Sequence, residues 1–461
     1  MKLESIADYY GEWNIPNTDD KFYGKILQEK NGSYLLEIMG NFSNAPPSNL
    51  IHKHDFINGI TTNGKKITLT GVIEHSKNCS YPGSIVTKYN FNEAFIGYHF
   101  NQNESIKFDA ISIPVNYLNK WMGIDPFTVK PDVNNLTMVY TTPEILKISL
   151  DTVGLNIEIK SEYTCNSNPS GYNIKEDSFI KLYKNKAEDF NELLNSINWL
   201  ITFLSVCYYQ PIQLPYISCH SNSQEDISYV LNRPIEYNNT NSSLFLVTYT
   251  NIKNDFVRIL QWWFENKEKL KVIGYIFKSL LKVDYAIPLE VRFSQSIQMV
   301  ETFHRKFKNN EYIPKDAIEP YILCLKNVLK KEKTKKLNNK LIGKIKYALT
   351  SKMKYAYEPS LMQRLKELIT HIPQNILTQT IITDDKFITN ICSLRNYYTH
   401  WDQIEGSPIN EQKIYDYAET LRLILIINLL KEMRFADDNI INIFKRNKTV
   451  KFNRSLIWPE Y

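Results

Sequence analysis

The sequence lacks the motifs that mark several common classes of enzyme. It contains no glycine-rich phosphate-binding loop, no Gly-x-Ser-x-Gly and no His-Glu-x-x-His. A phosphate cradle, a serine-hydrolase elbow and a zinc-protease helix are therefore not indicated. The six cysteines include no Cys-x-x-Cys pair. Because a chain of this size does not need disulfides to stabilise its core, we expect reduced thiols.

Long hydrophobic runs are also scarce. The longest, Ile197–Tyr209 and Leu421–Leu430, are short and are interrupted by polar residues such as Asn198 and Arg422. A membrane-spanning helix needs about 20 consecutive apolar residues, so we expect both runs to form buried helices. The first residues lack the charged and then apolar pattern of a secretory signal. We therefore expect a cytoplasmic protein with no membrane partner.

The composition is that of a folded protein of more than one domain. Hydrophobic residues make up 43% of the 461 positions, and aromatic residues 13%, which argues against disorder. The net charge is +6. This mildly basic balance permits an RNA partner without requiring one.

The first 185 residues are predicted to form a β-rich, sandwich-like domain. Segments rich in β-branched and aromatic residues alternate there with turn-forming clusters of Asn, Gly, Pro and Ser. The expected strands are Ser33–Phe42, Lys65–Glu74, Ser84–Phe91, Glu93–Phe100, Ser105–Pro114 and Leu146–Tyr163.

After residue 186 the hydrophobic period becomes helical, which predicts an α+β protein whose second part is all-α. We expect a mainly helical connecting region at 186–290, containing a strand at Ser243–Thr250, and a helical bundle at 291–461. The expected helices are Ala187–Tyr209, Asn254–Glu268, Leu270–Leu281, Pro288–Phe307, Pro314–Lys331, Asn339–Met353, Ser360–His371, Asp384–His400, Asn410–Arg434 and Asp437–Arg446.

Residues Arg395 to His400 carry the chemistry that the sequence shows most clearly. Arg395 offers a planar set of donors that matches a phosphate group, and His400 can accept and donate a proton near neutral pH. On a helix these two lie about 140° apart, whereas Asn396 and His400 share a face. The group could bind a phosphodiester and move protons at its oxygens. A surface ion pair of Arg395 with Asp402 is the alternative.

Arg395-Asn396-x3-His400 resembles the R-x4-6-H motif of HEPN ribonucleases, in which a polar residue follows the arginine. The first part of the chain resembles the N-terminal domain of ApeA-type HEPN anti-phage proteins. This second resemblance rests on Gly11-Glu-Trp13-Asn-Ile-Pro16, Tyr23-Gly24-Lys-Ile26, Tyr34-Leu-Leu-Glu-Ile-Met-Gly40, Phe95–Phe100, Ile106-Lys107-Phe108 and Leu118-Asn-Lys-Trp121.

The resemblance implies a homodimer or higher oligomer in which two motif helices face each other. It implies an endoribonuclease of phage defence that needs no metal or other cofactor and leaves a 2′,3′-cyclic phosphate. Arg395, His400 and Asn396 would be its catalytic residues. The implied substrate is tRNA or another single-stranded loop, and a phage-encoded activator is a possible partner.

Two further groups are candidates for accessory roles. Glu301 and His304, one helical turn apart, are predicted either to brace the motif helix or to form an ordinary salt bridge. Eleven lysines fall between residues 326 and 354. They predict either an RNA-binding surface or a solvated helical face. The RNA-binding candidates are Lys335, Lys336, Lys344, Lys346 and Tyr397.

Other interpretations stay open at this point. His52 and His54 would lie on one side of a strand, but a solvated pair is favoured over a metal site. The helical part could be a catalytically inactive binding module that recognises a phage product or a partner protein. A third possibility is an antitoxin-like, nucleotide-binding partner of a nucleotidyltransferase.

Overall fold

The fold comes from a computed structural model, which divides into two compact units. The first unit holds Met1–Ser242 and Thr248–Glu265, and the second holds Ser243–Val247 and Asn266–Tyr461. The residues that the structure describes are 9–42, 52–80, 82–100, 106–132, 136–168, 171–212, 214–221, 224–232, 245–281, 287–331, 339–353, 355–400 and 410–446.

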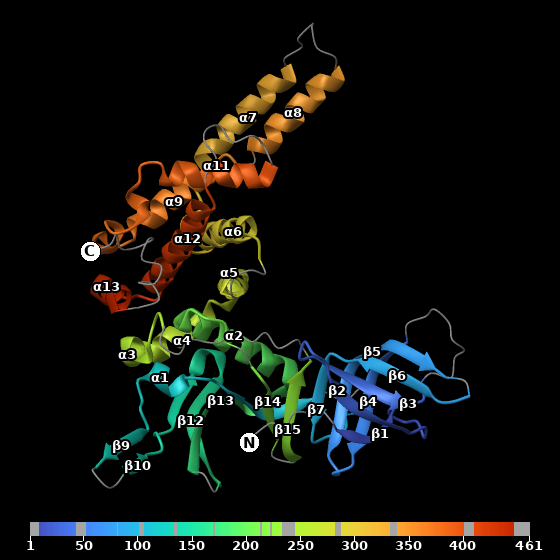
Figure 1. The fold of residues 1–461 in the computed structure, drawn as a ribbon. Coiled ribbons are helices and arrows are strands. Elements are labelled where there is room, and N and C mark those ends of the chain that lie inside the picture. The colour runs from blue at the N-terminus through green and yellow to red at the C-terminus, as the bar shows by residue number, and fades with distance from the viewer. Residues whose placement is uncertain are drawn as a thin grey trace. The chain divides into compact units, whose positions relative to one another are not determined.

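The described strands of the first unit form one 13-stranded sheet and a separate two-stranded sheet (Figure 1). The large sheet has the order β11-β12-β13-β8-β14-β15-β7-β5-β4-β1-β2-β3-β6. Its strands are β1 (Tyr10–Asn14), β2 (Phe22–Gln28), β3 (Tyr34–Met39), β4 (Lys53–Thr61), β5 (Lys66–Cys79), β6 (Ile85–Asn90), β7 (Glu93–Ile96), β8 (Lys107–Pro114), β11 (Leu146–Leu150), β12 (Leu155–Asn168), β13 (Gly171–Asp189), β14 (Ile217–Ser221) and β15 (Gln224–Leu231). β9 (Phe127–Pro131) and β10 (Leu136–Tyr140) form the small sheet.

Six of these strands close into a barrel. β5 pairs with β4 and also with β6, so the path β5-β4-β1-β2-β3-β6 returns to its start. The predicted β-rich domain is confirmed. The predicted sandwich-like arrangement is replaced by a closed barrel at its core. The barrel closes because the long β5 pairs with both β4 and β6.

Alternating apolar side chains fill the barrel. Leu36 and Ile38 of β3 and Ile67 and Leu69 of β5 are fully buried. Trp13 lies across Gly59 so closely that a Cβ at Gly59 would be 2.3 Å from the indole. We conclude that this strand position has to be glycine, because any larger residue would displace the tryptophan.

The remainder of the large sheet carries a helix, α2 (Phe190–Tyr208). The carboxylate of Asp189 accepts a hydrogen bond from the Asn191 N–H at 2.9 Å and caps this helix. β14 and β15 lie beyond α2 in the sequence, so the sheet extends past residue 185, the predicted end of the β-rich domain.

The predicted strand at Ser243–Thr250 is wrong where the structure describes it. Residues 245–247 form a bend, and Thr248 caps a short helix, α3 (Tyr249–Ile252), in a capping box with Asn251. The segment has the composition of a strand, but the cap gives its backbone groups local partners and starts a helix instead. α4 (Phe256–Glu265) follows.

All the regular secondary structure described in the second unit is helical, which confirms the predicted bundle. Its two longest helices, α6 (Leu289–Phe307) and α12 (Glu411–Glu432), pack along each other. The others are α5 (Lys267–Leu280), α7 (Lys315–Lys331), α8 (Asn339–Met353), α9 (Leu361–Thr370), α10 (Gln374–Leu377), α11 (Phe387–His400) and α13 (Asp437–Arg446). α7 and α8 lie side by side as a pair (Figure 1).

Both of the longest hydrophobic runs are buried helices, as predicted. Leu421–Leu430 lies within α12 and is buried along its whole length, and Arg422 inside it forms an ion pair with Glu419. Among the helices that the structure describes, we find none with the combined length and apolarity that crossing a bilayer requires.

Candidate active site

The motif helix α11 is anchored by one apolar face. Phe387, Ile391 and Leu394 recur at intervals of four and three residues, and each is at most 1% exposed. The helix packs against α6 and α9, and Tyr398 contacts Phe293 of α6 edge to face. This packing fixes the orientation of the opposite face.

Arg395 lies at the edge of that apolar face, one turn after Ile391, and Asn396 lies away from it. Arg395 is half-buried and Asn396 is exposed. The guanidinium of Arg395 donates to the side-chain oxygen of Asn396 over 3.3 Å, and Thr399 donates to the Arg395 carbonyl at 2.7 Å. His400 is the last residue of α11, and its side chain lies outside the described residues. The backbone places Asn396 and His400 one turn apart on the same side.

Glu301 of α6 lies close enough to α11 to act on its electrostatics. Burial raises the pKa of the Cys392 thiol; the positive charge of Arg395 opposes this rise, and the negative charge of Glu301 adds to it. Cys392 is one turn before Arg395. The predicted accessory residue Glu301 therefore lies on the side of α6 that faces the motif helix.

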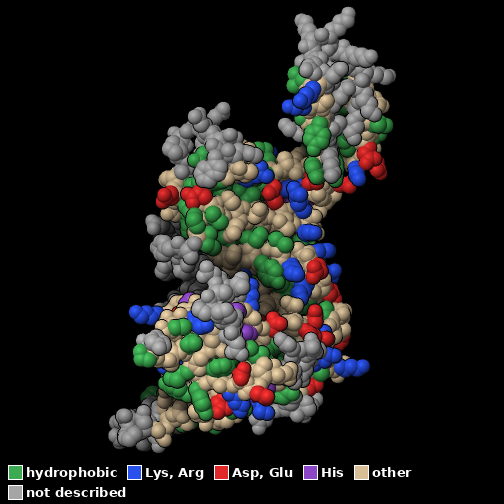
Figure 2. Space-filling model, turned by 90° about the vertical axis from the view of Figure 1, so that its right-hand side faces the viewer, with side chains coloured by type: hydrophobic (Ala, Val, Ile, Leu, Met, Phe, Trp, Pro, Cys, Tyr) green, Lys and Arg blue, Asp and Glu red, His purple; other side chains and the backbone are tan. Residues whose placement is uncertain are grey.

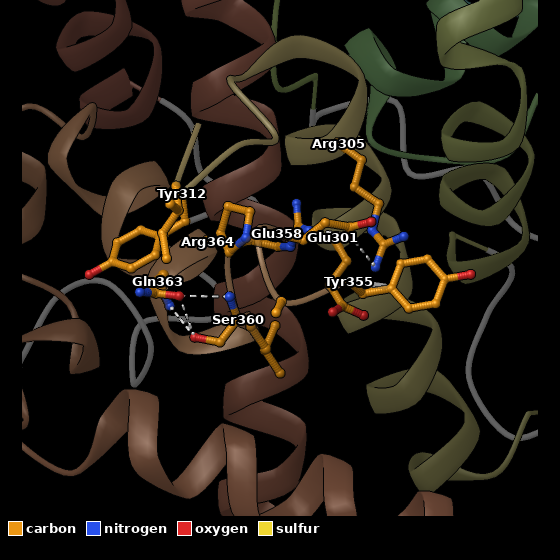
Figure 3. Close-up of a pocket in the computed structure, with 12 residues that line it drawn as sticks. Glu301, Arg305, Tyr312, Tyr355, Glu358, Ser360, Gln363 and Arg364 are labelled. Atoms are coloured by element: carbon orange, nitrogen blue, oxygen red, sulfur yellow. Dashed lines mark hydrogen bonds and ion pairs between the residues drawn. The ribbon is translucent and has the colours of Figure 1, made fainter. Parts of the chain in front are cut away.

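His304 belongs to a buried polar network between α6 and α9. Its side chain is fully buried, and its Nε2 lies 2.8 Å from a Glu367 carboxylate oxygen. Its Nδ1 lies 3.0 Å from Nη1 of Arg364. Arg364 also donates to Asn310 at 2.6 Å and to Glu358, which lies beside it in Figure 3, at 3.1 Å. The network therefore joins the two helices on which α11 packs.

The partners of His304 require a neutral ring. A guanidinium can only donate, so Nδ1 of His304 must accept from Arg364, and the ring's one proton is on Nε2, which donates to Glu367. Burial lowers the pKa of His304 below its usual 6.5, although Glu367 opposes the shift. The geometry and the direction of the shift agree.

This network predicts that the second unit loses stability in mild acid. Because the pKa of His304 is lower in the folded chain, the unfolded chain binds a proton first, and the stabilisation is lost as the pH falls below 6.5. We expect the melting temperature of the second unit to fall between about pH 7 and pH 5.5. In His304→Gln the fall should be smaller, as calorimetry would measure. An equal fall in both proteins would contradict the assignment.

Arg364 is the residue of this network that the sequence interpretation missed. It is 1% exposed, and it lies on the apolar face of α9 between Leu361, Leu365 and Leu368. A charge inside an apolar helical stripe is the signal that would have predicted a buried, paired arginine.

Arg364 and His371 also have the spacing of the HEPN motif, with an apolar residue after the arginine. In the structure, Arg364 and Arg395 have different surroundings. Arg364 is tied to Glu358, Asn310 and His304, and the His371 ring contacts the Asn428 side chain at 2.9 Å. Arg395 retains an exposed side with only the neighbouring Asn396 as a hydrogen-bonding partner among the described residues. We therefore keep the Arg395 helix as the candidate.

The predicted RNA-binding residues are divided between α8, α11 and undescribed chain. Lys344 is exposed on α8; Lys346 is on the same helix, but its side chain is outside the described residues, as are Lys335 and Lys336. Tyr397 is half-buried on α11 and contacts Tyr398 edge to face. Figure 2 shows basic, acidic and hydrophobic side chains on the described part of the α7–α8 pair, at the top of the view.

Three histidines of the first unit, including the metal-ligand candidate His54, have separate surroundings. His54 lies against Phe42 and Tyr89, His75 contacts Asn90, and the ring of His99 contacts the Gly59 carbonyl at 2.8 Å. Within the described ranges, no group of three or more His, Cys, Asp or Glu side chains could hold a metal ion.

A closed β-barrel in a large sheet, followed by a helical bundle whose penultimate long helix carries Arg-Asn-x3-His, defines a two-unit α+β protein of HEPN type. The chain belongs to the ApeA-type HEPN family. The domain described as ApeA N-terminal domain 1 matches residues 8–263, and the domain described as Apea-like HEPN matches residues 294–439. Comparison with curated proteins and with solved structures gives no match.

Proposed function

We propose that this anti-phage HEPN-family protein is an endoribonuclease that cuts RNA without a metal ion. The observation that carries the proposal is the half-buried Arg395 beside the exposed Asn396 on α11, within the part matched by the Apea-like HEPN domain. RNA supplies its own nucleophile, the 2′-hydroxyl, so catalysis requires only charge stabilisation and proton transfer.

Each residue of the motif has a role in the proposed reaction. Arg395 binds the scissile phosphate and stabilises the negative charge that develops on it. His400 acts as general base at the 2′-oxygen or as general acid at the leaving 5′-oxygen, and Asn396 orients the histidine or the phosphate. The products are a 2′,3′-cyclic phosphate and a free 5′-hydroxyl. Glu301 and His304 support α11 from α6.

The proposed substrate is single-stranded or looped RNA, with tRNA loops as the first candidate. A 2′-hydroxyl within a duplex cannot reach the in-line geometry that attack on the neighbouring phosphate requires. We further propose a cytoplasmic homodimer in which two α11 helices face each other, because one motif supplies a single arginine and a single histidine. A phage product acting on the N-terminal unit would be the activator.

The test is incubation of the purified full-length protein with total tRNA in the presence of EDTA. We expect discrete cleavage products that end in a 2′,3′-cyclic phosphate, at the rate seen without EDTA. Loss of cleavage in EDTA would contradict the proposed mechanism. RNA that is bound but stays intact would indicate a binding module instead of a nuclease.

A further inference from the structure

A shallow pocket of about 540 Å³ opens beside the candidate active site. The loop between α6 and α7 and the loop between α8 and α9 form part of its wall. None of the motif residues lines it. Its walls are Glu301, Arg305, Tyr312, Glu358, Ser360 and Arg364, with Tyr355 and several apolar neighbours (Figure 3).

Two tyrosines mark opposite ends of this pocket (Figure 3). Tyr312 precedes α7 and Tyr355 follows α8, and their side chains are 61% and 58% exposed. The two loops are pinned together, because the N–H groups of Tyr312 and Ile313 both donate to the Tyr357 carbonyl, at 2.8 and 3.3 Å. The Glu358 N–H also donates to the Tyr355 carbonyl at 3.1 Å. Both rings are therefore presented from a fixed frame.

The charged side chains between the tyrosines include one buried ion pair and two groups that a ligand could bind. Arg364 at the base is buried and bound to Glu358, so this pair is already neutralised. Arg305 is 53% exposed, and its Nη2 forms an ion pair with the Glu358 carboxylate at 3.6 Å. Glu301 has no hydrogen-bonding partner among the described residues. The pocket thus offers one cation and one carboxylate to a ligand.

This combination matches a nucleotide. Single-stranded bases stack on tyrosine rings, and a guanidinium matches a phosphate. A carboxylate only accepts hydrogen bonds. Guanine presents two adjacent N–H donors on its Watson–Crick edge, which suit a carboxylate, whereas uracil presents one N–H between two carbonyl oxygens that a carboxylate repels.

The surroundings favour RNA over a peptide as the ligand. The pocket lies at the base of the α7–α8 pair, and the eleven lysines between residues 326 and 354 begin within α7 and continue through α8. Such a run attracts a phosphate backbone. On the other side, Glu301 of α6 and Arg364 of α9 line the pocket, and α6 and α9 are the helices on which the motif helix α11 packs.

We propose that this pocket binds one unstacked guanine nucleotide of the substrate RNA, close to the scissile phosphate. Tyr312 and Tyr355 stack on bases at the two ends of the pocket, one of them on the guanine and the other on an adjacent base of the same strand, while Glu301 accepts the guanine N–H donors and Arg305 binds a neighbouring phosphate. Its place in catalysis rests on the proposed ribonuclease function, but the binding itself can be measured without cleavage.

The experiment is fluorescence anisotropy with the full-length protein and labelled 2′-O-methyl octanucleotides, which lack the nucleophile. One is all uridine, and the other has a single central guanosine. We expect the guanosine oligonucleotide to bind more tightly, and Tyr312→Ala and Tyr355→Ala each to weaken its binding about tenfold. Tyr275→Ala, which removes a 52% exposed tyrosine from α5, is the matched control. Tyr312→Phe should restore binding, because it keeps the ring.

Glu301→Gln should remove the preference for guanosine, because it weakens binding of the guanosine oligonucleotide and removes the carboxylate that repels the carbonyl oxygens of uracil. Equal binding of the two oligonucleotides by the native protein, or tyrosine variants that behave like Tyr275→Ala, would overturn the proposal. Guanosine-dependent binding by a protein that leaves tRNA intact would sustain the pocket and reject the nuclease. Cleavage of tRNA that is unaffected in all the pocket variants would support the nuclease function and reject the role of the pocket.

Discussion

Replacing Arg395 by alanine should reduce RNA cleavage about 10²- to 10³-fold, and replacing His400 should reduce it about 10²- to 10⁴-fold. Arg395→Ala removes the cation that stabilises the negative charge developing on the phosphate, and His400→Ala removes the group that transfers the proton. Cleavage rates on a labelled tRNA in EDTA would measure both. Either variant cutting at the native rate would contradict the assignment.

Ser393→Ala is the matched control for these two variants. Ser393 is an exposed residue of the same helix, two positions before Arg395. We expect it to cleave at the native rate. Circular dichroism should show unchanged helix content in all three variants, because Arg395 makes its side-chain hydrogen bond only with the adjacent Asn396 among the described residues.

Arg364→Ala should destabilise the second unit by about 3 kcal/mol. The substitution leaves the Glu358 carboxylate, 13% exposed, without the guanidinium that lies 3.1 Å away, and it removes the donor to the buried His304 ring. For a unit of roughly 200 residues this corresponds to a fall of about 6–12 °C in melting temperature. Differential scanning calorimetry of the full chain would resolve it.

Lys366→Ala provides the comparison for that measurement. Lys366 is exposed on the same helix, two residues beyond Arg364, and surface substitutions change stability by about 0.5 kcal/mol or less. A melting temperature for Arg364→Ala as high as for Lys366→Ala would mean that the buried network does not hold α6 to α9.

The sequence predicted the local elements well where hydrophobic period and caps agree. Asn339–Met353 is a helix with the predicted bounds, and Ser360 caps α9 through a capping box with Gln363. The motif helix was expected from Asp384 and begins at Phe387. Its apolar residues predicted which face is buried, because a stripe at spacings of three and four residues must face a neighbour.

Long-range pairing was the part that the sequence could not predict. Closure of the barrel depends on β5 pairing with both β4 and β6, and β14 and β15 join the sheet across the intervening α2. Strand composition does not specify such partners. The network around Arg364 also joins positions up to 63 residues apart, such as His304 and Glu367, so only the three-dimensional structure reveals it.

For the candidate site, the sequence supplied the residue types and the structure supplied their surroundings. Two arginines have the family spacing to a histidine, and only their environments distinguish them, since Arg364 is 1% exposed whereas Arg395 is half-buried beside the exposed Asn396. Pattern alone cannot report burial, because the same spacing occurs on inner and outer faces of helices.

The most direct test of the central claim is to mix two inactive variants. If Arg395 of one subunit and His400 of its partner share one site, a heterodimer of Arg395→Ala and His400→Ala retains one intact site of two. Random pairing should then restore about a quarter of the native cleavage rate. A mixture that stays as inactive as its two components would contradict a site shared between subunits.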